Sequence, residues 1–349
     1  MKLPRSDEAL KPSGAHDVQT VSVCIGTYNQ AQYLRECMES VFSQTYPVDE
    51  IWVSDDASTD KTDAVMEEIC KLHSVVHYYR QPRNLGIAGN LSWVLSQPVT
   101  DFIVRLDSDD RLEPAFVATL VDLMNKYPRA GYAHCNICEI DVHGAHTRMR
   151  RLHRPAVYEG PEEAIRRNTP SYRVAGNIVL YRSAALKDAN YYRSNVSWQY
   201  AEDWDLCLRI AILGWGNVHA AAPLARYRVW GDDKQGRFKR NMSGMECIIE
   251  VYKKTLEPEY IKRGWNTATI GKCMRRTALR YVDGIDSPFL TSAEREAYKA
   301  LLRRLGDSTW LSVRIYLAER GLNPIFRFMV RAQIRSKDTI KSCLRLVKR

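Results

Sequence analysis

Several features that would classify a protein quickly are missing from this 349-residue sequence. No apolar run approaches the roughly 18 residues that a membrane-spanning helix needs. Residues 1–20 mix charges with proline and glycine, so we expect no signal peptide. The nine cysteines are odd in number and follow no repeating spacing, which argues against a disulfide framework. These absences predict a reduced, cytoplasmic protein.

Motifs that cradle phosphates or bind zinc are also lacking or weak. Neither GxGxxG nor GxxxxGKS/T occurs, so nicotinamide-binding and P-loop proteins are disfavoured. Cys135 and Cys138, followed by His143 and His146, resemble a two-Cys, two-His zinc pattern. However, the two cysteines fall in a strand-like run, where their spacing directs them to different faces. We therefore interpret them as core or edge residues.

Charge is distributed unevenly along the chain, whose net charge is +10. Residues 241–349 hold 22 Lys+Arg and 11 Asp+Glu, whereas residues 1–240 hold 29 and 30. The basic balance therefore belongs to the C-terminal third, and it places a boundary near residue 240.

Short apolar runs alternate with helical periodicity in the first part of the chain. We expect strands at 21–25, 50–54, 75–79 and 102–106, and helices at 31–44, 60–72, 86–96 and 114–126. This alternation predicts an α/β fold with a mostly parallel sheet flanked by helices, in which ligands bind beyond the carboxyl ends of the strands. Further strands are expected at 130–137, 177–181, 217–221 and 225–229, and further helices at 202–213, 243–256, 265–282, 292–305 and 323–349.

An acidic cluster follows the run FIVRL, where the chain reads Asp107-Ser108-Asp109-Asp110. Carboxylates this close repel one another unless a cation or a proton lies among them. Mg²⁺ and Mn²⁺ favour such oxygen ligands together with substrate phosphates. The alternative is an aspartate-rich turn before the helix at 114–126, and the cluster alone does not decide between them.

Two further acidic segments lie where a strand ends and where a helix begins. In DDASTD, the Asp56 carboxylate can accept a hydrogen bond from the imide N–H of uracil or thymine, while Ser58 or Thr59 can cap the next helix. In EDWD, the positive end of the helix dipole would keep a carboxylate ionised, which suits a general base. The alternative for EDWD is an acidic cap.

The order of these motifs is more specific than any one of them. VSVCIGTYN, SVFSQT, DDASTD, NLG at 84–86, LDSDD and AEDW follow one another at plausible separations over about residues 20–231. This series resembles the family 2 inverting glycosyltransferases of GT-A fold that build bacterial cell-surface polysaccharides. The resemblance implies a flexible tail at 1–19, a catalytic domain at 20–240 with a nucleotide-binding half at 20–110 and an acceptor half at 111–240, and a basic helical region at 241–349.

The resemblance also implies a role for each matching residue. Asp203 would be the catalytic base, and Asp109 with Asp107 would hold Mn²⁺ or Mg²⁺ at the donor diphosphate. The nucleotide-sugar donor, a UDP- or dTDP-sugar, would be bound by Thr27, Tyr28, Asn29, Asp56, Asn84, Gly86, Asp107 and Ser108. The acceptor, a lipid-linked or growing glycan, would lie near Glu202, Trp204, Arg228 and Trp230. Other acceptor-side candidates are Arg173, Asn177, Trp198 and Gln199. The pattern predicts no nucleic-acid partner and specifies no oligomeric state.

One segment departs from the family pattern. Many members carry an aromatic-Arg-x-His segment after the EDW helix, and its histidine assists the metal or the phosphates. Here the segment reads Tyr227-Arg228-Val229-Trp230, so the histidine is absent. Arg228 or residues 232–234 are the candidates to replace it. The alternative is a site that relies on Asp109 and the donor phosphates alone.

The last 27 residues, 323–349, combine apolar positions at helical spacing with eight basic side chains. Such a helix can lie on an anionic membrane surface, gaining about 1 kcal/mol per basic residue. The alternative is a solvated face on a helix packed against the catalytic domain. For the whole chain, two other functions remain: a sugar-nucleotide-binding scaffold that has lost turnover, and a D-x-D phosphatase, whose motif would follow the first strand rather than the fourth.

Overall fold

The computed structural model describes residues 19–322 except 175, 177, 194–199 and 231–233, and it describes only the backbone of 234–240. The expected tail up to residue 18, the acceptor-side candidates Asn177, Trp198 and Gln199, the segment 232–233 and the expected helix at 323–349 lie outside the described residues. In the described part, no helix is both long enough and apolar enough to cross a bilayer.

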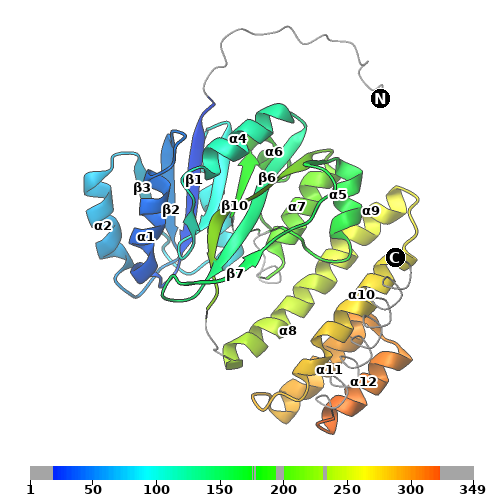
Figure 1. Ribbon diagram of the computed structural model, residues 1–349. Coiled ribbons are helices and arrows are strands. Elements are labelled where there is room, and N and C mark those ends of the chain that lie inside the picture. Colours follow the sequence, from blue (N-terminus) through cyan, green and yellow to red (C-terminus); the bar gives the residue numbers. More distant parts are fainter. Residues whose placement is uncertain (1–18, 175, 177, 194–199, 231–233, 323–349) are drawn as a thin grey trace, which may run out of the picture.

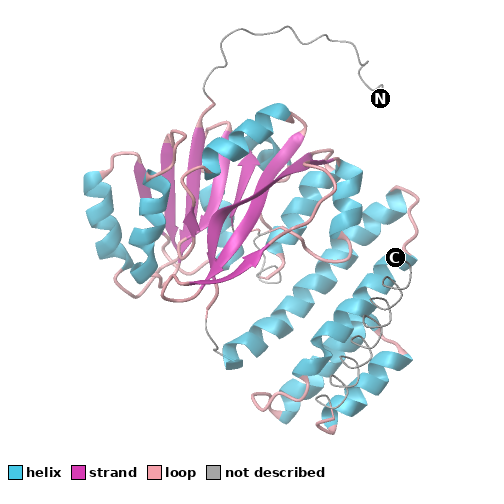
Figure 2. Cartoon of the chain, in the orientation of Figure 1, coloured by secondary structure: helices cyan, strands magenta, loops and turns pink. Residues whose placement is uncertain are grey.

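In the described part of the chain, ten strands form one sheet. Figure 2 shows these strands in magenta. They are β1 Val21–Thr27, β2 Glu50–Asp55, β3 Val76–Arg80, β4 Phe102–Asp107, β5 Arg111–Leu112, β6 Ala130–Ile140, β7 His146–Arg150, β8 Tyr158–Glu159, β9 Ile178–Arg182 and β10 Gly216–Arg228. Their order is β3-β2-β1-β4-β9-β6-β10-β5, with β7 beside β6 and β8 beside β10. The strands β3, β2, β1 and β4 pair in parallel, as do β6 and β10. The inserted strand β9 is antiparallel to both β4 and β6.

Helices cover both faces of this sheet and extend beyond its edge (Figure 1). They are α1 Ala31–Phe42, α2 Thr62–Leu72, α3 Gly86–Leu95, α4 Phe116–Lys126, α5 Pro161–Asn168, α6 Ser183–Asp188, α7 Glu202–Ile212, α8 Lys234–Glu250, α9 Glu257–Lys262, α10 Ala268–Tyr281, α11 Ser292–Gly306 and α12 Thr309–Glu319. A π-helical turn, Val251–Leu256, joins α8 to α9, and a 3₁₀ turn, Val282–Gly284, follows α10. The expected fold class, a mostly parallel sheet with helical layers and C-terminal helices, is confirmed.

The alternating side chains of the buried strands divide the interior into separate cores. On β1, Val23 and Ile25 face the core beneath α1 and α4, whereas Cys24 faces the core beneath α3, α6 and α7. A third core joins the C-terminal helices to α5 and α7. Helix α7 contributes to two of these cores, because its Leu206 packs toward the sheet and its Leu208 toward the C-terminal helices.

Two expected element boundaries are wrong. The strands expected at 217–221 and 225–229 are one strand, β10, whose register against β6 shifts on both sides of Pro223. Proline lacks the N–H that a regular ladder needs, and this irregularity keeps the strand continuous around it. The helix expected at 243–256 begins earlier, at Lys234. Its first turns have a polar sequence without apolar periodicity, so the sequence pattern does not indicate them.

Candidate active site

The loops after β1 and β2 are tied together at the carboxyl edge of the sheet. Asn29, which has a positive φ of 53°, accepts a hydrogen bond from the Thr59 amide at 2.8 Å through its Oδ1 atom. The Asn29 amide in turn donates to Ser58 Oγ at 2.8 Å. Between these contacts, Tyr28 is exposed, while the buried Thr27 Oγ1 has no hydrogen-bond partner among the described residues. The two loops therefore place the ring of Tyr28 and the hydroxyl of Thr27 at the carboxyl edge of the sheet. This edge, where the Asn29 contacts join the loops, is called the braced edge below.

Asp56 connects this edge to the beginning of α3. Its carboxylate accepts hydrogen bonds from the amides of Leu85 at 2.6 Å and Gly86 at 3.0 Å. The Asn84 side chain donates to the Asp56 carbonyl at 3.3 Å. Burial raises the pKa of Asp56, and the two backbone N–H groups oppose that rise. Three of the predicted donor-site residues, Asp56, Asn84 and Gly86, are thus in direct contact.

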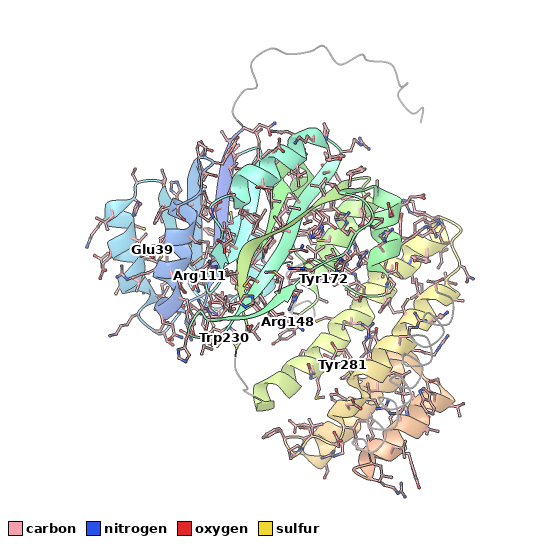
Figure 3. The ribbon with its side chains drawn as sticks, viewed as in Figure 1. Glu39, Arg111, Arg148, Tyr172, Trp230 and Tyr281 are labelled. Atoms are coloured by element: carbon pink, nitrogen blue, oxygen red, sulfur yellow. The ribbon has the colours of Figure 1, made fainter. Side chains whose placement is uncertain are left out.

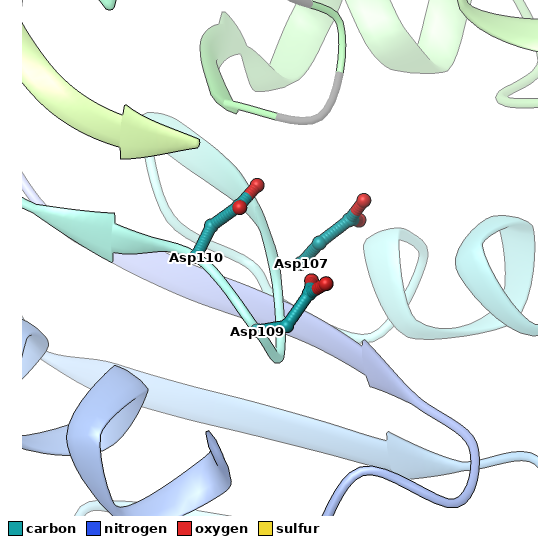
Figure 4. A group of neighbouring side chains, drawn as sticks. All are labelled: Asp107, Asp109 and Asp110. Atoms are coloured by element: carbon teal, nitrogen blue, oxygen red, sulfur yellow. The ribbon is translucent and has the colours of Figure 1, made fainter. Parts of the chain in front are cut away.

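The three aspartates after β4 form the acidic rim, the name used below for Asp107, Asp109 and Asp110. Their carboxylate oxygens lie within 4.8 Å of one another, and Figure 4 shows all three directed to the same side of the loop. Burial, reinforced by the charges of Asp109 and Asp203, raises the pKa of Asp107 to about 7. Burial also raises the pKa of Asp109. The rim is therefore a set of oxygen ligands whose ionised forms are disfavoured by burial.

The segment after β10 holds the acidic rim in place. Trp230 donates its indole N–H to Asp109 Oδ2 at 2.6 Å, and the Arg228 amide donates to Asp110 Oδ1 at 2.7 Å. Ser108, between the aspartates, donates its hydroxyl to Gln30 Oε1 at 2.6 Å. Sequence reasoning did not anticipate that Trp230 would bond an aspartate of the rim.

Arg228 is buried beneath the acidic rim, and each guanidinium nitrogen has a partner. Its Nε donates to the Asp109 carbonyl at 2.8 Å, its Nη1 to the Asp141 carbonyl at 2.9 Å, and its Nη2 to Glu36 Oε2 at 2.7 Å. The guanidinium also lies 4.3 Å from the ring centroid of Tyr33. These contacts make Arg228 a brace for the loop that carries the rim.

Arg105 links the acidic rim to the beginning of α7. Its buried guanidinium, on β4, forms an ion pair with Asp203 through Nη1 and another with Asp107 Oδ1 at 3.1 Å through Nη2. Nη1 also donates to the Gly176 carbonyl at 2.6 Å. A buried arginine between two carboxylates lowers the repulsion between them and fixes their separation. No local sequence pattern predicts this role of Arg105, since Asp203 lies 98 positions away.

Asp203 is held by two further neighbours. The Tyr192 hydroxyl donates to Asp203 Oδ1 at 2.7 Å, the same oxygen that Arg105 contacts. Gly176 packs against the side chain so closely that an added Cβ would lie 2.4 Å from Asp203 Cγ. Among the described residues, Asp203 Oδ2 accepts no hydrogen bond. The contacts thus orient the carboxylate through one oxygen and leave the other for a ligand.

The neighbours of Asp203 on α7 are buried. Glu202 is 7% exposed, its Oε2 atom has no hydrogen-bond partner among the described residues, and burial together with Asp203 raises its pKa well above the ordinary value. Trp204 donates its indole N–H to the Asn168 carbonyl at 2.9 Å. Of the first-turn residues Glu202, Asp203 and Trp204, Asp203 is therefore the one with an ionisable oxygen available to a ligand.

The possible zinc pattern consists of Cys135, Cys138, His143 and His146, and their positions in the fold bear on it. Within the described residues, the only group of three or more His, Cys, Asp or Glu ligand atoms close enough to share a metal is the acidic rim. Cys135 belongs to the buried core on one face of β6, whereas Cys138 is partly exposed. The interpretation of these cysteines as core or edge residues agrees with their positions.

Comparison with protein-family models gives a match to "Glycosyl transferase family 2" over residues 22–188. A putative glycosyltransferase, EpsE, of Bacillus subtilis is 30% identical over 66% of this chain and 80% of its own length. An uncharacterized glycosyltransferase of Haemophilus influenzae is 28% identical over 61% of this chain, and the match spans 66% of that protein, just under two thirds. The amylovoran biosynthesis glycosyltransferase AmsE of Erwinia amylovora is 26% identical over 66% of this chain and 84% of its own length.

Solved structures of low sequence identity share the fold. TarS of S. aureus in complex with UDP-GlcNAc matches with a TM-score of 0.63 and 16% identity, over 88% of this chain and 91% of that chain. The mannosyltransferase PcManGT of Pyrobaculum calidifontis in complex with GDP-Man and Mn²⁺ matches with a TM-score of 0.52 and 16% identity, over 85% and 87%. The architecture, the motif order and the relatives together lead to one assignment: the chain belongs to glycosyltransferase family 2, an inverting family of enzymes that use nucleotide sugars.

Proposed function

We propose that this enzyme transfers a sugar from a UDP- or dTDP-sugar, with inversion and in a metal-dependent reaction, to a hydroxyl of a lipid-linked or growing cell-surface glycan. The observation that carries the proposal is the bridge made by Arg105, which joins Asp107 of the acidic rim to Asp203. A one-step displacement needs the diphosphate site and the base at a fixed separation, and the bridge supports that arrangement.

On the donor side, we assign the nucleotide to the braced edge formed by the first two loops. The exposed ring of Tyr28 is suited to stack on a base, and the buried Thr27 hydroxyl, which has no partner among the described residues, is suited to bond it. Asp56 already accepts two backbone hydrogen bonds, so its part in base recognition would use the remaining lone pairs. Asn29, Asn84, Gly86 and Ser108 complete the proposed donor site.

The acidic rim fits a divalent cation. Its ligands are hard oxygen atoms within 4.8 Å of one another. Burial raises the pKa values of Asp107 and Asp109, so a divalent cation among them would stabilise their ionised forms. Asp109 and Asp107 would hold Mn²⁺ or Mg²⁺, which would supply charge neutralisation for the departing diphosphate. Asp110, which accepts a hydrogen bond from the Arg228 amide, would mainly shape the loop.

The proposed base is Asp203. Its Oδ2 atom would accept the proton of the acceptor hydroxyl while the hydroxyl oxygen bonds to the anomeric carbon. The bond from that carbon to the diphosphate oxygen breaks in the same step, and the electron pair leaves with the nucleoside diphosphate. Arg105 and Tyr192 stay bonded to Oδ1 during this step, so the orientation of the Asp203 carboxylate is maintained.

A turnover screen with several nucleotide sugars, with and without Mn²⁺, tests this function. We expect metal-dependent release of nucleoside diphosphate that is abolished in Asp109→Ala and lowered by at least about 100-fold in Asp203→Asn. Asp122→Asn, which changes an exposed carboxylate on α4, is the matched control and should be unaffected. Unchanged turnover in both site variants would contradict the assigned roles. Release of inorganic phosphate would indicate a phosphatase, and nucleotide binding without turnover would indicate a scaffold.

We also propose that the enzyme attaches peripherally to a membrane through residues 323–349, and this part of the proposal is based on their sequence. Their excess of lysine and arginine supports peripheral attachment to an anionic cytoplasmic face. Sedimentation with anionic liposomes should fall when Arg327, Arg331, Arg335 and Lys341 are replaced by glutamine. Equal sedimentation of both proteins would contradict it.

A further inference from the structure

A cavity of about 360 Å³ lies where α7 meets the C-terminal helices, and Asp203 is part of its lining. Its other walls come from the segments before β9 and α7, from α8 and the π-helical turn, and from α10. Figure 3 labels two of the lining residues, Tyr172 and Tyr281. The volume is within the usual range for sites that bind small molecules. The cavity therefore begins at the proposed base and extends toward the C-terminal helices.

Aromatic rings dominate the walls of this cavity. The polar atoms of two of them are already bonded within the protein, because Trp204 donates to the Asn168 carbonyl at 2.9 Å and Tyr252 donates to the Thr169 carbonyl at 3.0 Å. These two rings meet edge to face with centroids 5.2 Å apart. Tyr200, by contrast, lines the cavity with 41% of its surface exposed. Such walls suit a ligand with a flat apolar face and a polar edge, as a pyranose ring has.

One arginine contributes the positive charge of the lining. Arg280, near the end of α10, is exposed, and among the described residues it forms no hydrogen bond or ion pair. Asp203 is the only carboxylate among the described lining residues, and it already forms an ion pair with Arg105. An exposed arginine that has no partner among the described residues, at a ligand cavity, favours an anionic group on the ligand.

On the basis of the proposed transferase function, we propose that this cavity is the acceptor site and that it selects a pyranose whose anionic substituent pairs with Arg280. The substituent is a carboxylate on the sugar or a phosphate linked to it. In this arrangement the ring lies against Tyr200 and Tyr281 with one hydroxyl at Asp203 Oδ2. The C-terminal helices thus take part in acceptor choice.

A binding experiment on the full chain tests this proposal without requiring turnover. The probes are octyl β-glucuronide, glucosyl octyl phosphate and the neutral octyl β-glucoside, each titrated calorimetrically. We expect at least one anionic probe to bind about 10- to 100-fold more tightly than the neutral one, and Arg280→Gln to remove that preference. Arg276→Gln, an exposed arginine on the same helix, is the matched control and should keep it. The better anionic probe identifies the carboxylate or the phosphate as the source of the charge.

Equal affinity for the three probes, or no binding of any of them up to about 5 mM, would overturn the proposal. Kinetics provide a second test. Tyr200→Ala should lower transfer to the preferred probe about tenfold, through the acceptor KM rather than kcat, whereas Tyr316→Ala, which removes an exposed ring on α12, should leave transfer unchanged. A wild-type enzyme that releases no nucleoside diphosphate from any donor would contradict the transferase function, and the calorimetry would still decide whether the cavity binds the probes.

Discussion

The acidic rim and the aromatic cavity both adjoin Asp203, yet they are built from opposite chemistry. The rim concentrates three carboxylates in a loop braced by Arg228 and Trp230, and burial raises the pKa of Asp107 and Asp109. The cavity is lined by rings whose polar atoms are largely satisfied within the protein, with one arginine at its edge. The rim therefore offers ligands to a cation, whereas the cavity offers aromatic surface to a sugar ring. We expect the rim to respond strongly to pH and metal, and the cavity to respond to neither.

The largest effect should come from Arg105, because it serves the rim and the base together. Arg105→Gln would remove a buried guanidinium and leave the half-buried carboxylates of Asp107 and Asp203 without their shared cation. We expect a loss of about 3–5 kcal/mol in the free energy of unfolding, measured in urea, and a loss of transfer activity. Arg35→Gln removes an exposed pair with Glu68 and should cost less than about 1 kcal/mol. Similar losses in the two variants would refute the bridge.

Gly176→Ala should separate the two regions. An added Cβ would lie 2.4 Å from Asp203 Cγ and 2.3 Å from the Tyr172 hydroxyl, so the base and one wall of the cavity must move. We expect transfer to fall about 100-fold while Mn²⁺ still stabilises the rim in a thermal shift assay. Gly271→Ala on α10 meets only the mobile end of Arg275 and serves as the control. Loss of the Mn²⁺ response in Gly176→Ala would show that the regions are not separable.

The pH dependence of metal binding should distinguish the rim from the cavity. With a pKa of about 7, folded Asp107 holds a proton between about pH 4 and pH 7 that the unfolded chain has released, so its contribution to stability falls as pH rises through that window. Mn²⁺ must displace that proton. We expect its affinity, measured by thermal shift, to be roughly 30-fold weaker at pH 5.5 than at pH 8, which corresponds to about 2 kcal/mol.

The cavity provides the internal control for this measurement. Binding of octyl β-glucoside, which carries no charge, should be the same at the two pH values. A Mn²⁺ affinity that does not change with pH would contradict the assigned state of Asp107.

The smallest effect should come from Trp230, which gives one hydrogen bond to the rim. Its N–H lowers the pKa of Asp109 against the rise caused by burial. Trp230→Phe keeps the ring and removes the donor, so Asp109 becomes easier to protonate. We expect Mn²⁺ to bind a few-fold more weakly at pH 7, by about 1 kcal/mol, in the same assay. Trp310→Phe on α12 should have no effect, and equal affinities in the two variants would exclude this role for Trp230.

The residues of the rim could be predicted from sequence because their signals are local. Each apolar run and the acidic loop after it are adjacent in the chain, and parallel strands bring such loops to one edge. Arg105 could not be found in this way. Arg105 lies inside an apolar run, and its role depends on an ion pair with Asp203. Asp203 comes close to it only because α7 packs on the sheet.

The cavity was beyond sequence reasoning for a related reason. Trp204 and Tyr252 belong to helices that are distant in sequence, and ordinary apolar periodicity explains each of them equally well as core. The role of Trp230 was partly accessible, since the absent histidine had marked its segment. Only the geometry shows that an indole N–H bonds Asp109 there.

The double packing of α7 limits how acceptor preference can be transplanted between relatives. A chimera that exchanges the chain after residue 230 would bring new C-terminal helices against the old outer face of α7, formed by Trp204, Leu208, Ala211 and the N-cap residue Ala201. Mismatched volumes at that junction would tilt the helix and carry Asp203 away from Arg105. A graft that moves those four residues together with the new helices should preserve catalysis. Acceptor specificity is therefore transferred only when the matching face of α7 is transferred with the C-terminal helices.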